Sequence, residues 1–250
     1  MPKRGEFPKA IFYDSKNTLW AWEEVYIDVA RQILEKYNRK IDPVEFRRTM
    51  NSIGAENHRT AFGKFQKFTE NLRFSLLFAF KYYGIPGIGE DIRFMTDRWN
   101  DVQPFPDTIS ALTEQKRITK VLSYSNVETE YLDMMVDKLP EAAKPHFVAD
   151  MDKSGYCKPN PRSYRWVLET AGRQLNMDLN FSNVIYCAGV QWDVQGAMAC
   201  GMKACWIRRP YFTTPEPDGL RPDYIIDDLH ELTLIVERSL AGKLEYIPLA

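Results

Sequence analysis

KAIFYDSKNTL, from Lys9 to Leu19, is the stretch of sequence that decides the fold. Its first half is a short apolar run with aromatic and β-branched residues that ends at Asp14, which predicts a buried strand. Further runs of this kind predict strands at 118–124, 146–150, 183–187, 203–207 and 223–227. Helical patterns lie between them at 107–115, 128–139, 161–171 and 194–200. Alternating strands and helices predict an α/β protein with a Rossmann-like, doubly wound parallel sheet.

The stretch that follows the first strand has a different texture. It contains long helical patterns at 23–37, 43–53, 61–83 and 90–99, and no convincing strand. A helical block in this position predicts an α-helical cap inserted into the α/β core. We therefore expect a core of residues 1–20 and 100–250 and a cap of residues 21–99.

Composition narrows the class of protein. The chain has 250 residues and a formal net charge of −1, so we expect neither a nucleic acid nor a membrane surface as partner. Since no apolar run has spanning length and the N-terminus lacks the apolar segment of a signal peptide, we expect a soluble, cytoplasmic protein. The four cysteines and three histidines show no metal-ligand spacing, so we expect reduced thiols and no zinc site.

Polar residues follow several of the predicted strands and loops, and a parallel sheet brings such residues to one edge. The set comprises Asp14, Thr18, Ser125, Asn126, Lys158 and Asp193. A carboxylate becomes a useful nucleophile when it is desolvated and held ionised by a cation, and Lys158 can supply that charge to Asp14. Thr18 and Ser125 can donate hydrogen bonds to the carboxylate or its ester. Asp193 can hold the lysine or orient water.

These residues lie in motifs that resemble those of the haloacid dehalogenase superfamily, and most of all the L-2-haloacid dehalogenase subfamily. The motifs are YDSKNTL (13–19), SYSN (123–126), KPNPRSY (158–164) and WDVQGAMACGM (192–202). The segment PFPD (104–107) is similar to the family's junction where the chain re-enters the core. The likeness runs in order along nearly the whole chain, and the motifs are specific only as a set.

The resemblance implies a hydrolase with two chemical steps. Asp14 would displace a leaving group from the α-carbon of a small carboxylic acid, by default a 2-haloacid, and water would then hydrolyse the aspartyl ester. The resemblance implies that the enzyme needs no metal and no other cofactor, and it is compatible with a homodimer. The substrate would contact residues of the first motif, the cap and the later loops, namely Lys16, Trp20, Arg47, Arg48, Asn126 and Tyr164.

Some residues of these motifs differ from the family pattern, and these differences leave functions other than dehalogenation possible. Lys16 stands where these dehalogenases have tyrosine and the phosphatase branch has aspartate, and Ala188 and Val190 replace the usual serine and asparagine. Asn17 stands where glycine is usual, and asparagine tolerates an unusual turn backbone. Lys16 could donate a proton to a different leaving group or anchor a carboxylate. The alternatives are opening of a cyclic amine such as azetidine-2-carboxylate, phosphatase action, and a non-catalytic binding module.

Overall fold

The computed structural model describes residues 7–60, 67–87, 89–212 and 221–242, with the side chains of 53–60 left out. A six-stranded, all-parallel sheet has the strand order β3–β2–β1–β4–β5–β6. The strands are β1 (Ala10–Asp14), β2 (Lys120–Ser125), β3 (Phe147–Asp150), β4 (Val184–Ala188), β5 (Lys203–Ile207) and β6 (Tyr224–Ile226). The strands expected from the apolar runs are therefore present, and the predicted parallel sheet is confirmed.

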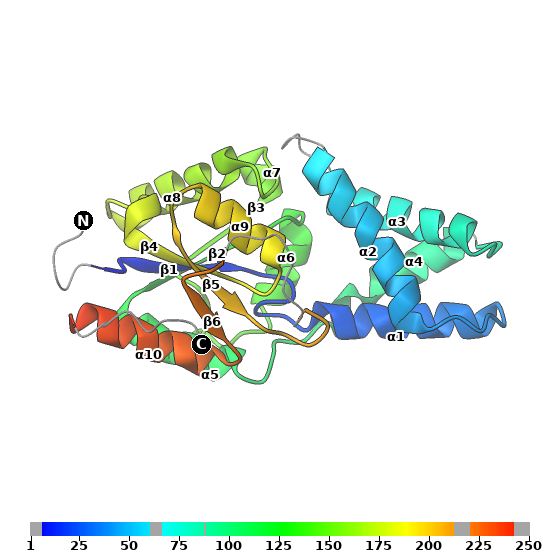
Figure 1. Cartoon of the computed structure of the whole chain (residues 1–250), viewed down its shortest axis with the longest axis horizontal. Coiled ribbons are helices and arrows are strands. Elements are labelled where there is room, and N and C mark those ends of the chain that lie inside the picture. The colour runs from blue at the N-terminus through cyan, green and yellow to red at the C-terminus, as the bar shows by residue number, and fades with distance from the viewer. Residues whose placement is uncertain (1–6, 61–66, 88, 213–220, 243–250) are drawn as a thin grey trace.

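Helices cover both faces of the sheet (Figure 1). Side chains of β1 alternate between the two faces: Ile11 belongs to the core cluster that includes α5 and α10, and Phe12 to the one that includes α8 and α9. These elements of the core are α5 (Thr108–Ile118), α6 (Thr129–Val136), α7 (Met151–Ser154), α8 (Pro161–Leu175), α9 (Gln191–Ala199), α10 (Leu229–Leu240) and the short 3₁₀ helix η2 (Phe181–Asn183).

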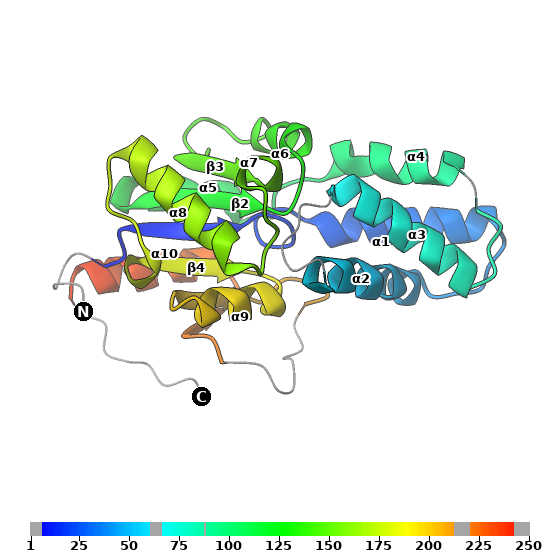
Figure 2. The ribbon, with the colours of Figure 1, turned by 90° about the horizontal axis from the view of Figure 1, so that it is seen from above.

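The remaining helices lie together beyond the end of β1, to one side of the sheet (Figure 2). They are α1 (Trp22–Lys36), α2 (Pro43–Thr60), α3 (Phe68–Tyr82), α4 (Gly89–Asp97) and the 3₁₀ helix η1 (Arg98–Asp101). The helix expected at 61–83 is described from Phe68, and residues 61–66 lie outside the described part. The division into a core of residues 1–20 and 100–250 and a cap of residues 21–99 stays a proposal, and its outermost residues, 1–6 and 243–250, are not described.

The chain leaves and re-enters the sheet at one place. The Ala21 amide donates to the Gln103 carbonyl at 2.9 Å, and Trp20 forms an antiparallel bridge with Pro104. Beside this crossing, the rings of Trp22 and Trp99 lie 4.1 Å apart between centroids. Backbone pairing and aromatic packing therefore fix α1 and η1 to each other at the edge of the sheet.

Arg209, just after β5, connects the loop that follows β1 to other segments of the core. Its guanidinium donates two hydrogen bonds to Asp107, at 2.8 and 2.9 Å, and a third to the Thr18 carbonyl at 3.0 Å. Asp107 also accepts from the Leu229 amide at 2.9 Å. Arg209 and Asp107 are both buried. Because this buried pair joins four segments that are distant in sequence, its loss would disturb the loop that follows β1.

No helix in the described part of the chain is long and apolar enough to cross a membrane.

We expect Arg209→Met to lower the free energy of unfolding by about 3–5 kcal/mol, because it leaves the Asp107 carboxylate buried without its partner. Urea denaturation followed by circular dichroism measures this. The matched control is Arg208→Met, which removes an exposed pair with Asp227 and should cost less than about 1 kcal/mol. Equal losses in the two variants would contradict the role given to Arg209.

Candidate active site

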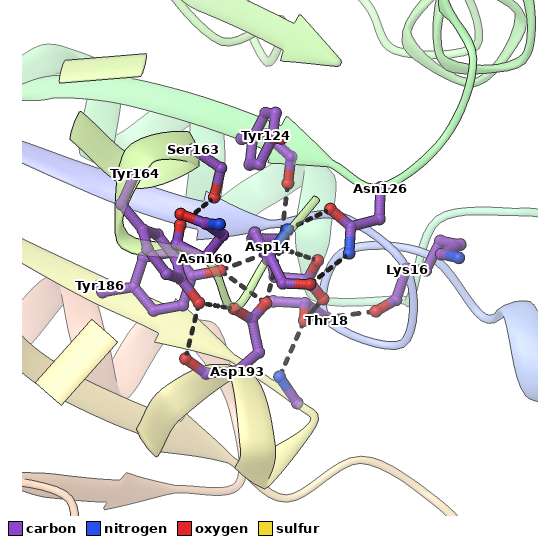
Figure 3. A network of polar contacts seen from close by, with 12 residues as sticks. Asp14, Lys16, Thr18, Tyr124, Asn126, Asn160, Ser163, Tyr164, Tyr186 and Asp193 are labelled. Atoms are coloured by element: carbon purple, nitrogen blue, oxygen red, sulfur yellow. Dashed lines mark hydrogen bonds and ion pairs between the residues drawn. The ribbon is translucent and has the colours of Figure 1, made fainter. Parts of the chain in front are cut away.

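The predicted site residues gather where the strand order reverses, between β1 and β4. In an open parallel sheet this switch point leaves a crevice beyond the carboxyl ends of the strands. Asp14 is the last residue of β1, and Gly189 and Asp193 follow β4. Lys158 comes from the loop before α8, and its Nζ contacts Asp14 and Asp193, which point toward each other in Figure 3. The sheet topology thus brings a lysine and two aspartates, distant in sequence, into contact.

Lys158 lies between the two carboxylates. Its Nζ donates to Asp14 Oδ1 and to Asp193 Oδ2, both at 2.6 Å, and also contacts the Tyr186 hydroxyl at 3.0 Å and the Tyr124 carbonyl at 3.3 Å. Only 1% of the Lys158 side chain is exposed. Burial alone would lower the pKa of Lys158, but Asp14 and then Asp193 outweigh burial and hold this pKa above its usual value. The lysine is therefore an ammonium in the folded protein.

Asp193 is buried and contacts Lys158 and two tyrosine hydroxyls. Its Oδ2 accepts from Tyr186 at 2.6 Å, and its Oδ1 accepts from the hydroxyl of Tyr164. Burial, followed by the charge of Asp193, raises the pKa of both tyrosines, so they are neutral donors. Asp193 is itself buried and is not part of the pocket wall. Of its two expected roles, holding the lysine fits this geometry and orienting a pocket water does not.

Thr18 holds the other oxygen of the nucleophile candidate. Its hydroxyl donates to Asp14 Oδ2 at 2.8 Å and accepts from the Gly189 amide at 2.8 Å. This arrangement needs glycine at 189, because a Cβ there would lie 1.9 Å from the Asn17 carbonyl oxygen. Asn17 has a φ of 55°, a left-handed backbone that asparagine adopts more readily than most residues. The loops after β1 and β4 are thus in direct contact.

Asn126 and Ser125 lie close to this cluster in sequence but differ from expectation. The Asn126 side chain donates to the Lys158 carbonyl at 3.0 Å and accepts from the Lys158 amide at 2.8 Å, so it positions the lysine's backbone. It also lines the pocket. The Ser125 hydroxyl is buried and finds no hydrogen-bond partner among the described residues. The hydrogen bond expected from Ser125 to Asp14 is therefore absent in this structure.

A cavity of about 610 Å³ opens above the nucleophile candidate. Its floor includes Asp14 and Lys158, and helices α1 and α3 contribute Trp22, Phe68 and Asn71. A cavity of this size that joins a polar floor to a largely apolar wall is typical of a small-molecule site.

Four of the residues expected to contact the substrate divide into two groups. Arg47 and Arg48 line the cavity, Arg47 buried and Arg48 exposed. Trp20 and Tyr164 do not line it, which corrects the expectation for both. The Trp20 backbone pairs with Lys16 and Pro104, and its side chain is buried in the core. Tyr164 is buried too and uses its hydroxyl on Asp193.

Lys16 also lines the cavity, but apart from the Lys158 cluster. Its Nζ lies 3.3 Å from the centroid of the Phe68 ring and 5.5 Å from that of Trp22. In Figure 3, the dashed line that reaches Lys16 ends on its backbone carbonyl, which accepts from Thr18. Protein surrounds most of the side chain, and this burial lowers the pKa of Lys16 to about 7, against the opposing charge of Asp14.

Several residues of the site could not be recognised from the sequence. Tyr186 lies inside an apolar strand, where aromatic residues usually pack, and gives no sign that its hydroxyl meets Asp193. Glu23 is the second residue of α1 and pairs with Arg47 through Oε1 at 3.1 Å. Arg209 contacts Asp107 of the PFPD segment. That segment was the one feature of the sequence that pointed to this part of the site.

Among the residues that the structure describes, no group of three or more histidine, cysteine, aspartate or glutamate side chains is arranged to hold a metal ion.

We expect Gly189→Ala to destabilise the protein by about 1–3 kcal/mol, because the added methyl group must push the loops after β1 and β4 apart. Urea denaturation measures the free energy, and a crystal structure of the variant shows whether the Thr18 bond is broken. Gly89→Ala is the control, because a Cβ there meets nothing within 4 Å. That change should be neutral or mildly stabilising. A stable Gly189→Ala protein with the Thr18 bond intact would contradict the tight contact.

Comparison with known proteins adds independent evidence. No protein-family model matches the chain. It is 26% identical over 133 residues to haloacetate dehalogenase H-2 of Moraxella sp. (strain B), covering 53% of this chain and 56% of that protein. It is 25% identical over 184 residues to (S)-2-haloacid dehalogenase 1 of Pseudomonas sp. (strain CBS-3), covering 72% of this chain and 77% of that protein. The match thus spans just over half the length of the first relative.

A solved structure of L-2-haloacid dehalogenase from Xanthobacter autotrophicus, with chloropropionic acid covalently bound, has a TM-score of 0.74 to this chain. The two are 19% identical, over 92% of this chain and 99% of that chain, so this likeness speaks for the fold. Fold, motifs and sequence similarity agree. The resemblance predicted from the motifs is confirmed: the chain has the haloacid dehalogenase fold, and the curated proteins that it is similar to are haloacid dehalogenases.

Proposed function

We propose that this protein is a hydrolase that removes halide from the α-carbon of a small 2-haloacid, with Asp14 as its nucleophile. One observation carries the proposal: Asp14, 6% exposed at the floor of the cavity, has one oxygen held by Lys158 at 2.6 Å and the other by Thr18 at 2.8 Å. Such contacts fix the orientation of the carboxylate and place a positive charge beside it, which is what a carboxylate nucleophile needs.

In the first step, an oxygen of Asp14 forms a bond to the α-carbon while the carbon–halogen bond breaks. The electron pair of that bond leaves with the halide, and the configuration at carbon inverts. Lys158 and Thr18 hold the carboxylate in place as its negative charge passes to the leaving group. The product of this step is an ester between Asp14 and the substrate acid.

In the second step, water attacks the ester carbonyl, the bond between that carbon and the substrate oxygen breaks, and a 2-hydroxy acid leaves. One proton of the water ends on the hydroxyl of the product and the other is released to solvent, which restores Asp14 as a carboxylate. The carbonyl oxygen gains negative charge during this attack. The Lys158 ammonium and the Thr18 hydroxyl already contact the two Asp14 oxygens and can stabilise that charge. Asp193 keeps Lys158 in position and protonated. Since residues 188 and 190 are apolar here, groups other than their side chains must hold the attacking water.

The named activities of the curated relatives support this choice of substrate, since one is a haloacetate dehalogenase and the other a 2-haloacid dehalogenase. The four cysteines are free thiols, and this agrees with a reducing compartment. We include a cytoplasmic location and a homodimeric assembly in the proposal, the latter by analogy with related enzymes.

A single turnover in water enriched in oxygen-18 tests the nucleophile. With enzyme in excess over 2-chloropropionate, we expect one heavy oxygen to enter Asp14, because water attacks the ester carbonyl and the original carboxylate oxygen leaves with the product. Trypsin releases residues 10–16, a peptide in which Asp14 is the one acidic side chain, so mass spectrometry locates the label. We also expect Asp14→Asn to abolish halide release.

The control peptide spans residues 121–138, which carry four acidic side chains and should remain unlabelled. Asp133→Asn, a change at an exposed aspartate of α6, should leave halide release unchanged. Heavy oxygen found in the hydroxy acid after the first turnover, with none in residues 10–16, would refute the ester mechanism.

A further inference from the structure

The cavity wall on the cap side contains an arginine that is already neutralised. Arg47 forms an ion pair with Glu23: its Nη2 donates to Oε2 at 3.2 Å, and its Nε lies 3.1 Å from Oε1 without forming a hydrogen bond. Asn51 donates a further hydrogen bond to Glu23 at 2.7 Å, and the Arg47 guanidinium lies 5.3 Å from the Tyr26 ring. Both charged groups are buried. Separating them would leave a buried charge without a partner, so Arg47 is poorly suited to receive an anion.

Lys16 is in the opposite situation. Among the described residues that line the cavity, the positively charged ones are Lys16, Arg47, Arg48 and Lys158. Lys158 is committed to two carboxylates, Arg47 to one, and Arg48 is exposed. No carboxylate of the described residues pairs with the Lys16 ammonium, whose nearest recorded neighbours are the faces of Phe68 and Trp22. An ammonium in such surroundings has lost water without gaining a counter-ion.

The direction of the displacement decides which anion Lys16 would meet. An in-line displacement expels the leaving group on the side of the carbon that faces away from the nucleophile. Asp14 belongs to the floor of the cavity, at the end of β1, whereas the Lys16 ammonium lies against Phe68 of α3 and near Trp22 of α1. The leaving group would therefore depart toward these aromatic rings and the ammonium between them.

We propose that Lys16, and not Arg47, receives the departing halide. This inference rests on the proposed function and adds a residue to it. As the carbon–halogen bond breaks, its electron pair passes to the halogen, and the resulting halide forms an ion pair with the Lys16 ammonium. No proton is transferred. Because aromatic side chains keep water from this wall, the ion pair is stronger than it would be in solvent.

The charge of Lys16 makes this role depend on pH. The groups that act on it are Asp14 and Glu128, which favour the ammonium, and Lys158 and Arg47, which oppose it. With its pKa lowered to about 7, Lys16 is charged below that pH and neutral above it. Halide binding and kcat/KM should therefore both decline as the pH rises through 7.

Crystals soaked in bromide test the site without turnover. At pH 6 we expect an anomalous peak for bromide beside the Lys16 Nζ, and we expect that peak to be lost at pH 9 and in Lys16→Met, which keeps the length of the side chain. Lys81→Met, a change at an exposed lysine of α3, should keep the peak. A peak beside Arg47 or Arg48, or an empty cavity, would overturn the proposal.

Kinetics with different leaving groups then test the step itself. We expect Lys16→Met to reduce kcat/KM for 2-chloropropionate by about 10²–10³-fold, the loss seen when one preorganised charge-stabilising donor is removed. The loss should be larger for 2-fluoropropionate and smaller for 2-bromopropionate, since fluoride most needs stabilisation. The variant should also lack the decline of kcat/KM above pH 7.

Equal losses for the three substrates would show that Lys16 binds the substrate carboxylate, and would overturn the assignment to the halide. Failure of the proposed function looks different: wild-type enzyme would release no halide from any of the three acids. In that case the bromide crystals still decide whether Lys16 forms an anion site.

Discussion

The Lys158 ammonium, shared between Asp14 and Asp193, is the interaction on which the site depends. Two buried carboxylates this close would repel each other strongly without a cation between them. The cation in turn needs both carboxylates, because burial by itself would favour its neutral form. The tyrosine hydroxyls on Asp193 and the Asn126 side chain on the Lys158 backbone complete a network that fixes each member in one geometry. The carboxylate of Asp14 is thus held at the cavity by a rigid support.

Much of the architecture could be predicted from the sequence because it follows from periodicity. Buried parallel strands appear as short apolar runs, and polar residues directly after such runs must lie at one edge of the sheet. The strand pattern therefore predicts that Asp14, Thr18 and Asp193 lie close together, and Lys158 is expected at the same edge from the loop before the helix at 161–171. The left-handed backbone at Asn17 follows from the local preference of asparagine in turns.

What could not be predicted depends on contacts between helices. A helical pattern shows which face is buried but not which residue it meets, so nothing in the sequence indicates that Glu23 neutralises Arg47. Trp20 is a large aromatic residue of the kind that often lines an apolar pocket, yet its backbone pairs with Pro104 and its ring belongs to the core. Ser125 stands at a strand end like the other candidates, but its hydroxyl is buried without a hydrogen-bond partner among the described residues, and the sequence pattern gives no sign of this.

The antiparallel bridge between Trp20 and Pro104 has a consequence for how proteins with this arrangement can diversify. The two ends of the helical insertion meet at adjacent backbone positions. The length and sequence of the inserted segment should therefore have little effect on the structure of the sheet. Mutations in α1–α4 can therefore change the side chains that these helices contribute to the cavity, while the cluster of Asp14, Lys158 and Asp193 keeps its geometry. In this arrangement, the shape of the cavity can change in evolution independently of the charged cluster at its base.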